Sequence, residues 1–153
     1  MFKWYRKKAV DYFSPNEKDT IVTAIKNAEQ RTSGEIRVYI ESKCRFVNAL
    51  DRAIELFDGL NMYNTQERNA VLVYIAMKDR QLAVFADDGI YKKMGSEFWN
   101  EQVKRMLHHF NRNDYADGIA SIVTSIGEAL HQHFPYDKVS DTNELSDDIV
   151  FGN

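Results

Sequence analysis

The hydrophobic positions along the chain follow spacings typical of helices in some stretches and of strands in others. Residues 14–32 and 48–60 carry apolar side chains at three- and four-residue steps, and each stretch opens on a helix-capping residue, which predicts two amphipathic helices. Residues 35–41 alternate between apolar and polar, so we expect a strand with one apolar face. Residues 69–76 form a nearly continuous apolar run, which predicts a central strand covered on both faces.

A second strand follows almost immediately, because residues 81–86 are again apolar after one short turn, and the two strands should form an antiparallel hairpin. Two more helices are expected, one from Ser96 and one from Asp114. This order of elements predicts an α/β fold, a three-layer αβα sandwich with a mixed central sheet of four strands or fewer. The helix between the first two strands implies a right-handed crossover, so these strands should be parallel.

The two ends of the chain differ in composition from its middle. Residues 1–13 are basic and aromatic, residues 14–135 hold the predicted helices and strands, and residues 136–153 are acidic with few apolar anchors. We therefore expect one domain with an N-terminal segment and a loosely docked tail. The basic, aromatic start could touch an anionic lipid surface or RNA, although a solvated terminus is the simpler interpretation.

Composition narrows the classes of function. The net charge of −3 argues against nucleic acid as the main partner, and 44% apolar residues are ordinary for a globular protein. No stretch approaches the roughly 20 apolar residues of a transmembrane helix, and the basic start lacks the apolar core of a signal peptide. A single cysteine, Cys44, cannot form an internal disulfide. We expect a cytoplasmic protein with no membrane span, which leaves a protein partner and the oligomeric state open.

An acidic corner, Asp87-Asp88-Gly89, ends the predicted hairpin. The short turn fixes the register of the hairpin and places Asn69 opposite Asp88, while parallel pairing brings the start of the first strand to the same edge. Carboxylate, amide and carbonyl oxygens suit Ca²⁺ or Mg²⁺, and a zinc site would need a Cys/His cluster. A plain acidic turn in a structural scaffold is the competing interpretation. The residues expected to hold the divalent ion are Asp87, Asp88, Asn69 and Glu35.

Several short motifs stand in order along the chain: Thr32-Ser33-Gly34-Glu35-Ile36-Arg37-Val38, Arg68-Asn69-Ala70-Val71-Leu72, Asp79-Arg80, Asp87-Asp88-Gly89-Ile90, and Asn113-Asp114-Tyr115 with Gly118. Together they resemble the successive landmarks of the TPM domain family. The resemblance covers residues 14–135, and the tail from Asp141 to Ile149 is similar to the ending of stand-alone bacterial members. It implies an αβα sandwich whose loops at one sheet edge can bind divalent ions, often calcium.

The same resemblance implies relatives of several kinds, including thylakoid proteins linked to photosystem II repair and to acid phosphatase activity, and membrane-anchored bacterial proteins. The two aspartates could supply a nucleophile and a general acid, or hold a metal that activates water. A phosphatase also needs a cation for the phosphate group, and Arg37 and Arg68 are the candidates, although a structural salt bridge is the simpler role for both. We expect a metal-binding regulatory or interaction module, with metal-assisted acid phosphatase as the alternative and enzyme status open.

Overall fold

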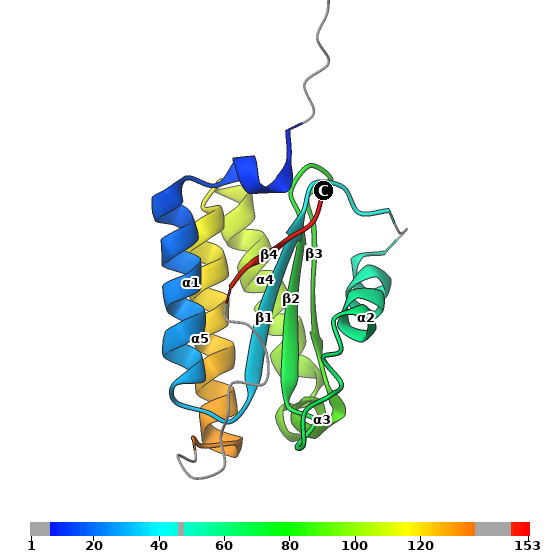
Figure 1. The fold of residues 1–153 in the computed structure, drawn as a ribbon, viewed down its shortest axis with the longest axis vertical. Coiled ribbons are helices and arrows are strands. Elements are labelled where there is room, and N and C mark those ends of the chain that lie inside the picture. Colours follow the sequence, from blue (N-terminus) through cyan, green and yellow to red (C-terminus); the bar gives the residue numbers. More distant parts are fainter. Residues whose placement is uncertain (1–6, 46–47, 137–147) are drawn as a thin grey trace, which may run out of the picture.

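A four-stranded mixed sheet forms the middle layer of the protein in a computed structural model, which describes residues 7–45, 48–136 and 148–153 (Figure 1). The strand order is β3-β2-β1-β4, with β1 parallel to both β2 and β4, and with β2 and β3 joined as an antiparallel hairpin. The predicted parallel crossover and the predicted hairpin are both confirmed. The strands are β1 (Glu35–Glu41), β2 (Ala70–Ala76), β3 (Gln81–Ala86) and β4 (Val150–Phe151).

Helices cover both faces of the sheet, which confirms the three-layer αβα sandwich (Figure 1). Three of them, α1, α4 and α5, pack on one face, and α2 packs on the other against β2 and β3. The short helix α3 lies at the lower end of the sheet in Figure 1, and a 3-10 turn, η1, lies at the upper end. Their bounds are η1 (Ala9–Tyr12), α1 (Pro15–Glu29), α2 (Ala49–Gly59), α3 (Asp88–Met94), α4 (Ser96–Asn111) and α5 (Tyr115–His133).

The predicted capping residues start the first two long helices. The Ser14 hydroxyl accepts a hydrogen bond from the Glu17 amide at 3.1 Å, and the Glu17 carboxylate accepts one from the Ser14 amide at 2.9 Å. This reciprocal pair satisfies amide groups that have no partner inside the helix. Asn48 caps α2 through its side-chain oxygen, which accepts hydrogen bonds from the amides of the next helical turn. Local sequence therefore fixes where both helices begin.

Two apolar cores flank the sheet, and β2 contributes to both. All seven of its residues are buried, as expected for a central strand. The side chains of Val71, Val73 and Ile75 face the α1, α4 and α5 layer, whereas Leu72 and Tyr74 face α2. Among the described residues, no helix is both long enough and apolar enough to cross a membrane.

Two elements differ from the sequence prediction. Asp87 ends β3 as expected, but it also caps α3, whose seven residues are too few for a readable helical period. The second element is β4, which adds residues 150–151 to the sheet beside Tyr39 and Ile40 of β1. Ile149 and Phe151 pack against the larger core, so this part of the acidic tail docks on the sheet edge. The rest of the tail, residues 137–147, lies outside the described residues.

A buried polar network closes the smaller core at the end of β1. The carboxylate of Glu41 accepts hydrogen bonds from Arg52 Nε at 2.8 Å and from a terminal nitrogen of Arg52 at 3.0 Å, and also one from the Tyr74 hydroxyl. The Glu41 and Arg52 side chains are only 6% and 14% exposed. Because little of these polar groups is exposed to water, the Glu41 carboxylate depends on Arg52 and Tyr74 for its hydrogen bonds.

The buried hydroxyl of Tyr74 leads us to expect a loss of stability at alkaline pH. Burial, followed by its hydrogen bond to the Glu41 carboxylate, raises the pKa of Tyr74 above the ordinary value of 10.0. The folded protein therefore keeps this proton where the unfolded chain loses it, so the contribution is complete below about pH 10 and falls as the pH rises further. In urea unfolding at a series of pH values, Tyr74→Phe should show a shallower alkaline decline than the parent protein. Tyr136→Phe, at an exposed position, is the control and should follow the parent; an identical decline in both variants would contradict the prediction.

Candidate metal centre

The acidic corner lies where the register of the sheet was expected to place it. Ala76 pairs with Gln81 at the turn of the hairpin, and at the other end the Asp87 amide donates a hydrogen bond to the Ala70 carbonyl at 3.0 Å. On the opposite side of β2, Ala70 pairs with Glu35. The four residues predicted as metal ligands therefore all come to one end of the sheet, the lower end in Figure 1.

Asp87 is the buried member of the acidic pair, with 1% of its surface exposed. One carboxylate oxygen accepts a hydrogen bond from the Asp88 amide at 2.8 Å, so Asp87 acts as the N-cap of α3. The other oxygen accepts a hydrogen bond from Arg68 Nε at 2.7 Å. This ion pair joins the loop before β2 to the start of α3, and Arg68 supplies the counter-charge for the buried carboxylate.

Asp88 and Gly89 form the exposed side of the corner. Asp88 is the first residue of α3, where the partial positive charge of the helix end favours a carboxylate. Gly89 touches the 61–69 loop so closely that a Cβ atom there would lie 2.1 Å from the Glu67 carbonyl oxygen and 2.5 Å from the Arg68 carbonyl oxygen. Glycine is thus required for close approach rather than for a positive φ angle, and the contact brings backbone oxygens to the acidic corner.

Asn69 and Glu35 lie at the same end of the sheet but make other contacts. Asn69 is 2% exposed. Its side-chain nitrogen donates a hydrogen bond to the Ser33 hydroxyl at 3.5 Å. Its side-chain oxygen is buried without a hydrogen-bond partner among the described residues. Glu35 is 3% exposed, and its backbone amide donates to the Asn69 carbonyl at 3.3 Å. The whole of β2 lies between β1, which carries Glu35, and β3, which ends just before Asp87.

The acidic corner offers several oxygen atoms to a metal ion, but only two of its possible ligands, Asp87 and Asp88, are adjacent carboxylates. Within residues 7–45, 48–136 and 148–153, no three His, Cys, Asp or Glu side chains come together in a group that could hold an ion. A divalent cation bound here would take its ligands from Asp87 and Asp88, with carbonyl or amide oxygens and water completing its shell. Such mixed oxygen shells are usual for Ca²⁺ and Mg²⁺.

Two further residues, Arg68 and Tyr63, lie beside the corner, and only Tyr63 was not considered from the sequence. The Arg68 guanidinium lies 5.2 Å from the centre of the Tyr63 ring, and its hydrogen bond to Asp87 raises the pKa of Arg68. Burial, followed by the negative charge of Asp87, raises the pKa of Tyr63. The salt-bridge role expected for Arg68 is therefore confirmed. Tyr63 carries no signal in the sequence, because it follows α2 in an irregular loop.

Comparison with known proteins agrees with this architecture. The family model of the TPM domain matches residues 7–129. The BA42 protein of the psychrophilic bacterium Bizionia argentinensis, solved by NMR, is 33% identical and superposes with a TM-score of 0.81, over 90% of this chain and 94% of that chain. A search of curated proteins gave no match.

Two more distant NMR structures share the fold. The N-terminal domain of a protein from P. gingivalis is 16% identical with a TM-score of 0.68, over 82% of this chain and 83% of that chain. The N-terminal domain of the cg2496 protein from Corynebacterium glutamicum is 15% identical with a TM-score of 0.59, over 77% of this chain and 74% of that chain. At this level of identity, the similarity extends to the fold alone.

Proposed function

We propose that this chain, which belongs to the TPM domain family, is a divalent-metal-binding regulatory or interaction module whose ion joins the 61–69 loop to the start of α3. The observation that carries the proposal is the Arg68–Asp87 ion pair, which already joins these two segments through a cation. Asp87 and Asp88 together carry two negative charges, and Arg68 balances one of them. A divalent ion between the two carboxylates would balance both.

The donor set fits a hard cation such as Ca²⁺ or Mg²⁺. Asp87 and Asp88 would be the charged ligands, and the Glu67 and Arg68 carbonyl oxygens at Gly89 lie against the same turn. The buried side-chain oxygen of Asn69 has no hydrogen-bond partner among the described residues, so it is a further donor at this end of the sheet. Glu35 begins β1 and therefore lies one strand further from Asp87 than Asn69 does. It would act on the ion through water or at a distance.

Exchange of cations would give the module its response. When the bound ion neutralises Asp87, Arg68 is no longer needed as its counter-charge. The Arg68 side chain, which is 48% exposed, can then leave the carboxylate. Its departure would also uncover one face of the Tyr63 ring. The surface offered to a protein partner would then differ between the metal-free and the metal-bound protein, as in other proteins in which an ion orders loops.

The alternative of a metal-assisted acid phosphatase has weaker support. It requires a cation that holds the phosphate group, and Arg68 is already paired with Asp87 in this structure. The other candidate, Arg37, is only partly buried on β1, and its Nε is buried without a hydrogen-bond partner among the described residues. Turnover of an aryl phosphate that depended on added metal and was abolished by Asp88→Asn would favour the phosphatase instead.

A metal titration of the protein tests the proposal. Addition of Ca²⁺, and separately of Mg²⁺, should shift the NMR signals of Asp88, Gly89 and the 61–69 loop in a saturable manner and should raise the melting temperature. A ligand that binds only the folded state stabilises it by about 2.7 kcal/mol at a hundredfold excess over its Kd. Absence of any saturable shift with either ion would contradict the proposal.

The variant Asp88→Asn should abolish the metal-dependent rise in melting temperature. It is the cleaner choice, because Asp87→Asn would also leave Arg68 without its carboxylate partner. Asp117→Asn is the matched control, since Asp117 is likewise an exposed aspartate in the first turn of a helix. Glu35→Gln should reduce the rise only slightly. If Asp88→Asn responded to calcium like the parent protein, the assigned corner would be wrong, and the acidic residues 141–148 would be tested next.

A further inference from the structure

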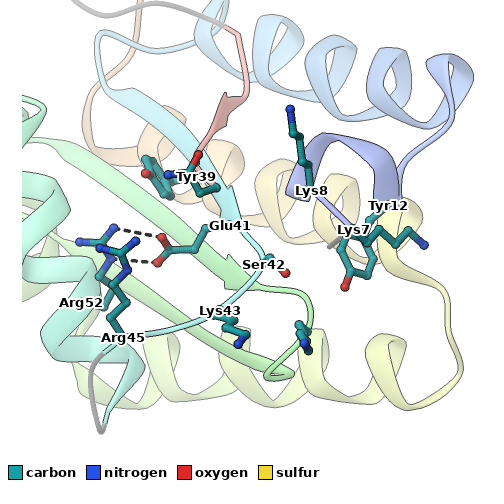
Figure 2. A pocket seen from close by; sticks show the side chains of 12 residues that line it. Lys7, Lys8, Tyr12, Tyr39, Glu41, Ser42, Lys43, Arg45 and Arg52 are labelled. Atoms are coloured by element: carbon teal, nitrogen blue, oxygen red, sulfur yellow. Dashed lines mark hydrogen bonds and ion pairs between the residues drawn. The ribbon is translucent and has the colours of Figure 1, made fainter. Parts of the chain in front are cut away.

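A second charged site lies at the opposite end of the sheet from the acidic corner. A pocket of about 680 Å³ opens beyond the end of β1, between the start of η1, the 42–45 segment, the β2–β3 turn and the residues after β4. Figure 2 shows Lys7, Lys8 and Tyr12 on one side of it and Arg45 and Arg52 on the other, with the end of β1 between them. Pockets of this size commonly hold small molecules.

The pocket is strongly cationic although the chain as a whole carries a net charge of −3. Glu41 is the one carboxylate side chain among its lining residues, and Arg52 neutralises it. The other five cations make no ion pair with another described residue. This leaves a local surplus of five positive side-chain charges, drawn from three separate segments of the chain. The cationic residues that line the pocket are Lys7, Lys8, Lys43, Arg45, Arg52 and Lys78.

Backbone hydrogen bonds connect three of the segments that surround the pocket, so the positions from which Lys43 and Lys78 extend are fixed before any ligand arrives. The Lys78 amide donates to the Ser42 carbonyl at 2.7 Å, and the Ser42 amide donates to the Asn153 carbonyl at the same distance. The Gly152 amide donates to the Ile40 carbonyl at 2.8 Å. The turn after β2, the segment after β1 and the residues after β4 therefore form one connected rim. A preformed rim lowers the entropic cost of binding.

Aromatic rings complete the lining. Tyr39 extends from β1 into the pocket wall, and its ring stacks on that of Tyr74 with centroids 6.3 Å apart. Gly152 leaves room for it, because a Cβ atom there would lie 2.5 Å from the Tyr39 hydroxyl oxygen. On the far side, the Lys7 ammonium group lies 4.3 Å from the centre of the Tyr12 ring. A planar ligand ring would thus find an aromatic surface next to the cations.

We propose that this pocket binds a multiply phosphorylated small molecule of the nucleoside polyphosphate class, with its phosphates on Lys43, Arg45 and Lys78 and its base against Tyr39. Lysine and arginine are the usual phosphate ligands, and several charges are matched best by a polyanion. Open α/β sheets commonly bind ligands beyond the carboxyl ends of their parallel strands, which is where this pocket lies. The proposal is independent of the metal site.

Calorimetry with ATP and with inorganic tripolyphosphate, in buffer without divalent ions, tests this inference. ATP should bind one site per chain and should shift the NMR signals of Tyr39, Ser42 and Lys78. The triple variant Lys43→Gln, Arg45→Gln, Lys78→Gln should weaken ATP binding by at least about tenfold, because three charge-assisted contacts are lost. All three side chains are exposed, so the fold should be retained, which an unchanged melting temperature would verify.

A matched control variant distinguishes specific ATP binding in the pocket from non-specific attraction of ATP to any positively charged surface. The triple variant Lys26→Gln, Lys92→Gln, Lys104→Gln removes three exposed cations elsewhere and should bind ATP like the parent protein. An equal loss in both triple variants, or no saturable ATP binding, would overturn the proposal. Tyr39→Leu should weaken ATP more than tripolyphosphate; equal effects would refute the base contact. Binding to phosphatidylserine vesicles without binding of ATP would assign the pocket to a lipid surface instead.

Discussion

Replacement of Glu41 with alanine is expected to lower the free energy of unfolding by about 3–5 kcal/mol, the usual cost of leaving one partner of a buried ion pair alone. The carboxylate accepts two hydrogen bonds from Arg52 and one from Tyr74, and all of these groups are buried or nearly so. Without Glu41, a guanidinium and a hydroxyl would remain in the smaller core with lost hydrogen bonds. A guanidinium stays protonated in proteins even without a partner, so Arg52 could not avoid the unpaired charge by losing its proton.

The control for this prediction is Glu55→Ala. Glu55 also contacts Arg52, at 3.0 Å, but its side chain is 53% exposed. Its removal should cost less than about 1 kcal/mol, as for other surface ion pairs. Urea unfolding of both variants gives the comparison. Similar, small changes in the two variants would show that water replaces the Glu41 carboxylate, and the buried network would then contribute little to stability.

The layered fold was predictable because its signals are local. The period-two alternation of residues 35–41 fixed which face of β1 is apolar, and the continuous apolar run of residues 70–76 marked β2 as central. The short turn between Ala76 and Gln81 sets the register of the hairpin, so the position of Asp87 opposite Ala70 follows from the sequence. Once the turn is known, the partner of each residue in the hairpin follows from counting residues outward along the two strands.

Side-chain partners at the same edge could not be predicted in this way. Register brought Asn69 and Glu35 to the end of the sheet, but it did not show that Arg68 would bind Asp87 or that Asn69 would turn toward Ser33. Such choices depend on side-chain rotamers and loop geometry. The strand β4 was missed for a related reason: it is a pair of residues whose partner, β1, lies more than 100 positions earlier.

The cationic pocket was invisible in the sequence, since its charges come from segments that are far apart. It lies beyond the carboxyl end of β1, whereas the acidic corner lies at the other end of β2. A strand of seven residues is roughly 20 Å long, so a phosphate held among Lys43, Arg45 and Lys78 would be out of reach of Asp87. If the proposed pocket holds phosphate groups, phosphate binding and the aspartate pair would belong to separate sites, an arrangement that does not suit a phosphatase.

Truncation of Leu72 to alanine is expected to cost about 2–5 kcal/mol of unfolding free energy. Leu72 is fully buried at the centre of β2, where it pairs with Arg37 of β1 on one side and with Phe85 of β3 on the other. Its side chain belongs to the smaller core beneath α2. That core is covered by one helix only, so the extent to which α2 can move into the space left by Leu72 decides where in this range the cost falls.

The appropriate control is Leu107→Ala, because Leu107 in α4 is 41% exposed and loses little burial on truncation. Denaturant midpoints of the two variants should differ clearly, with the slope of unfolding unchanged in both. An unchanged midpoint for Leu72→Ala would mean that α2 packs too loosely on the sheet to bury this face of β2. The smaller core, including the Glu41 network that forms the floor of the cationic pocket, would then be a weakly held layer rather than a second core.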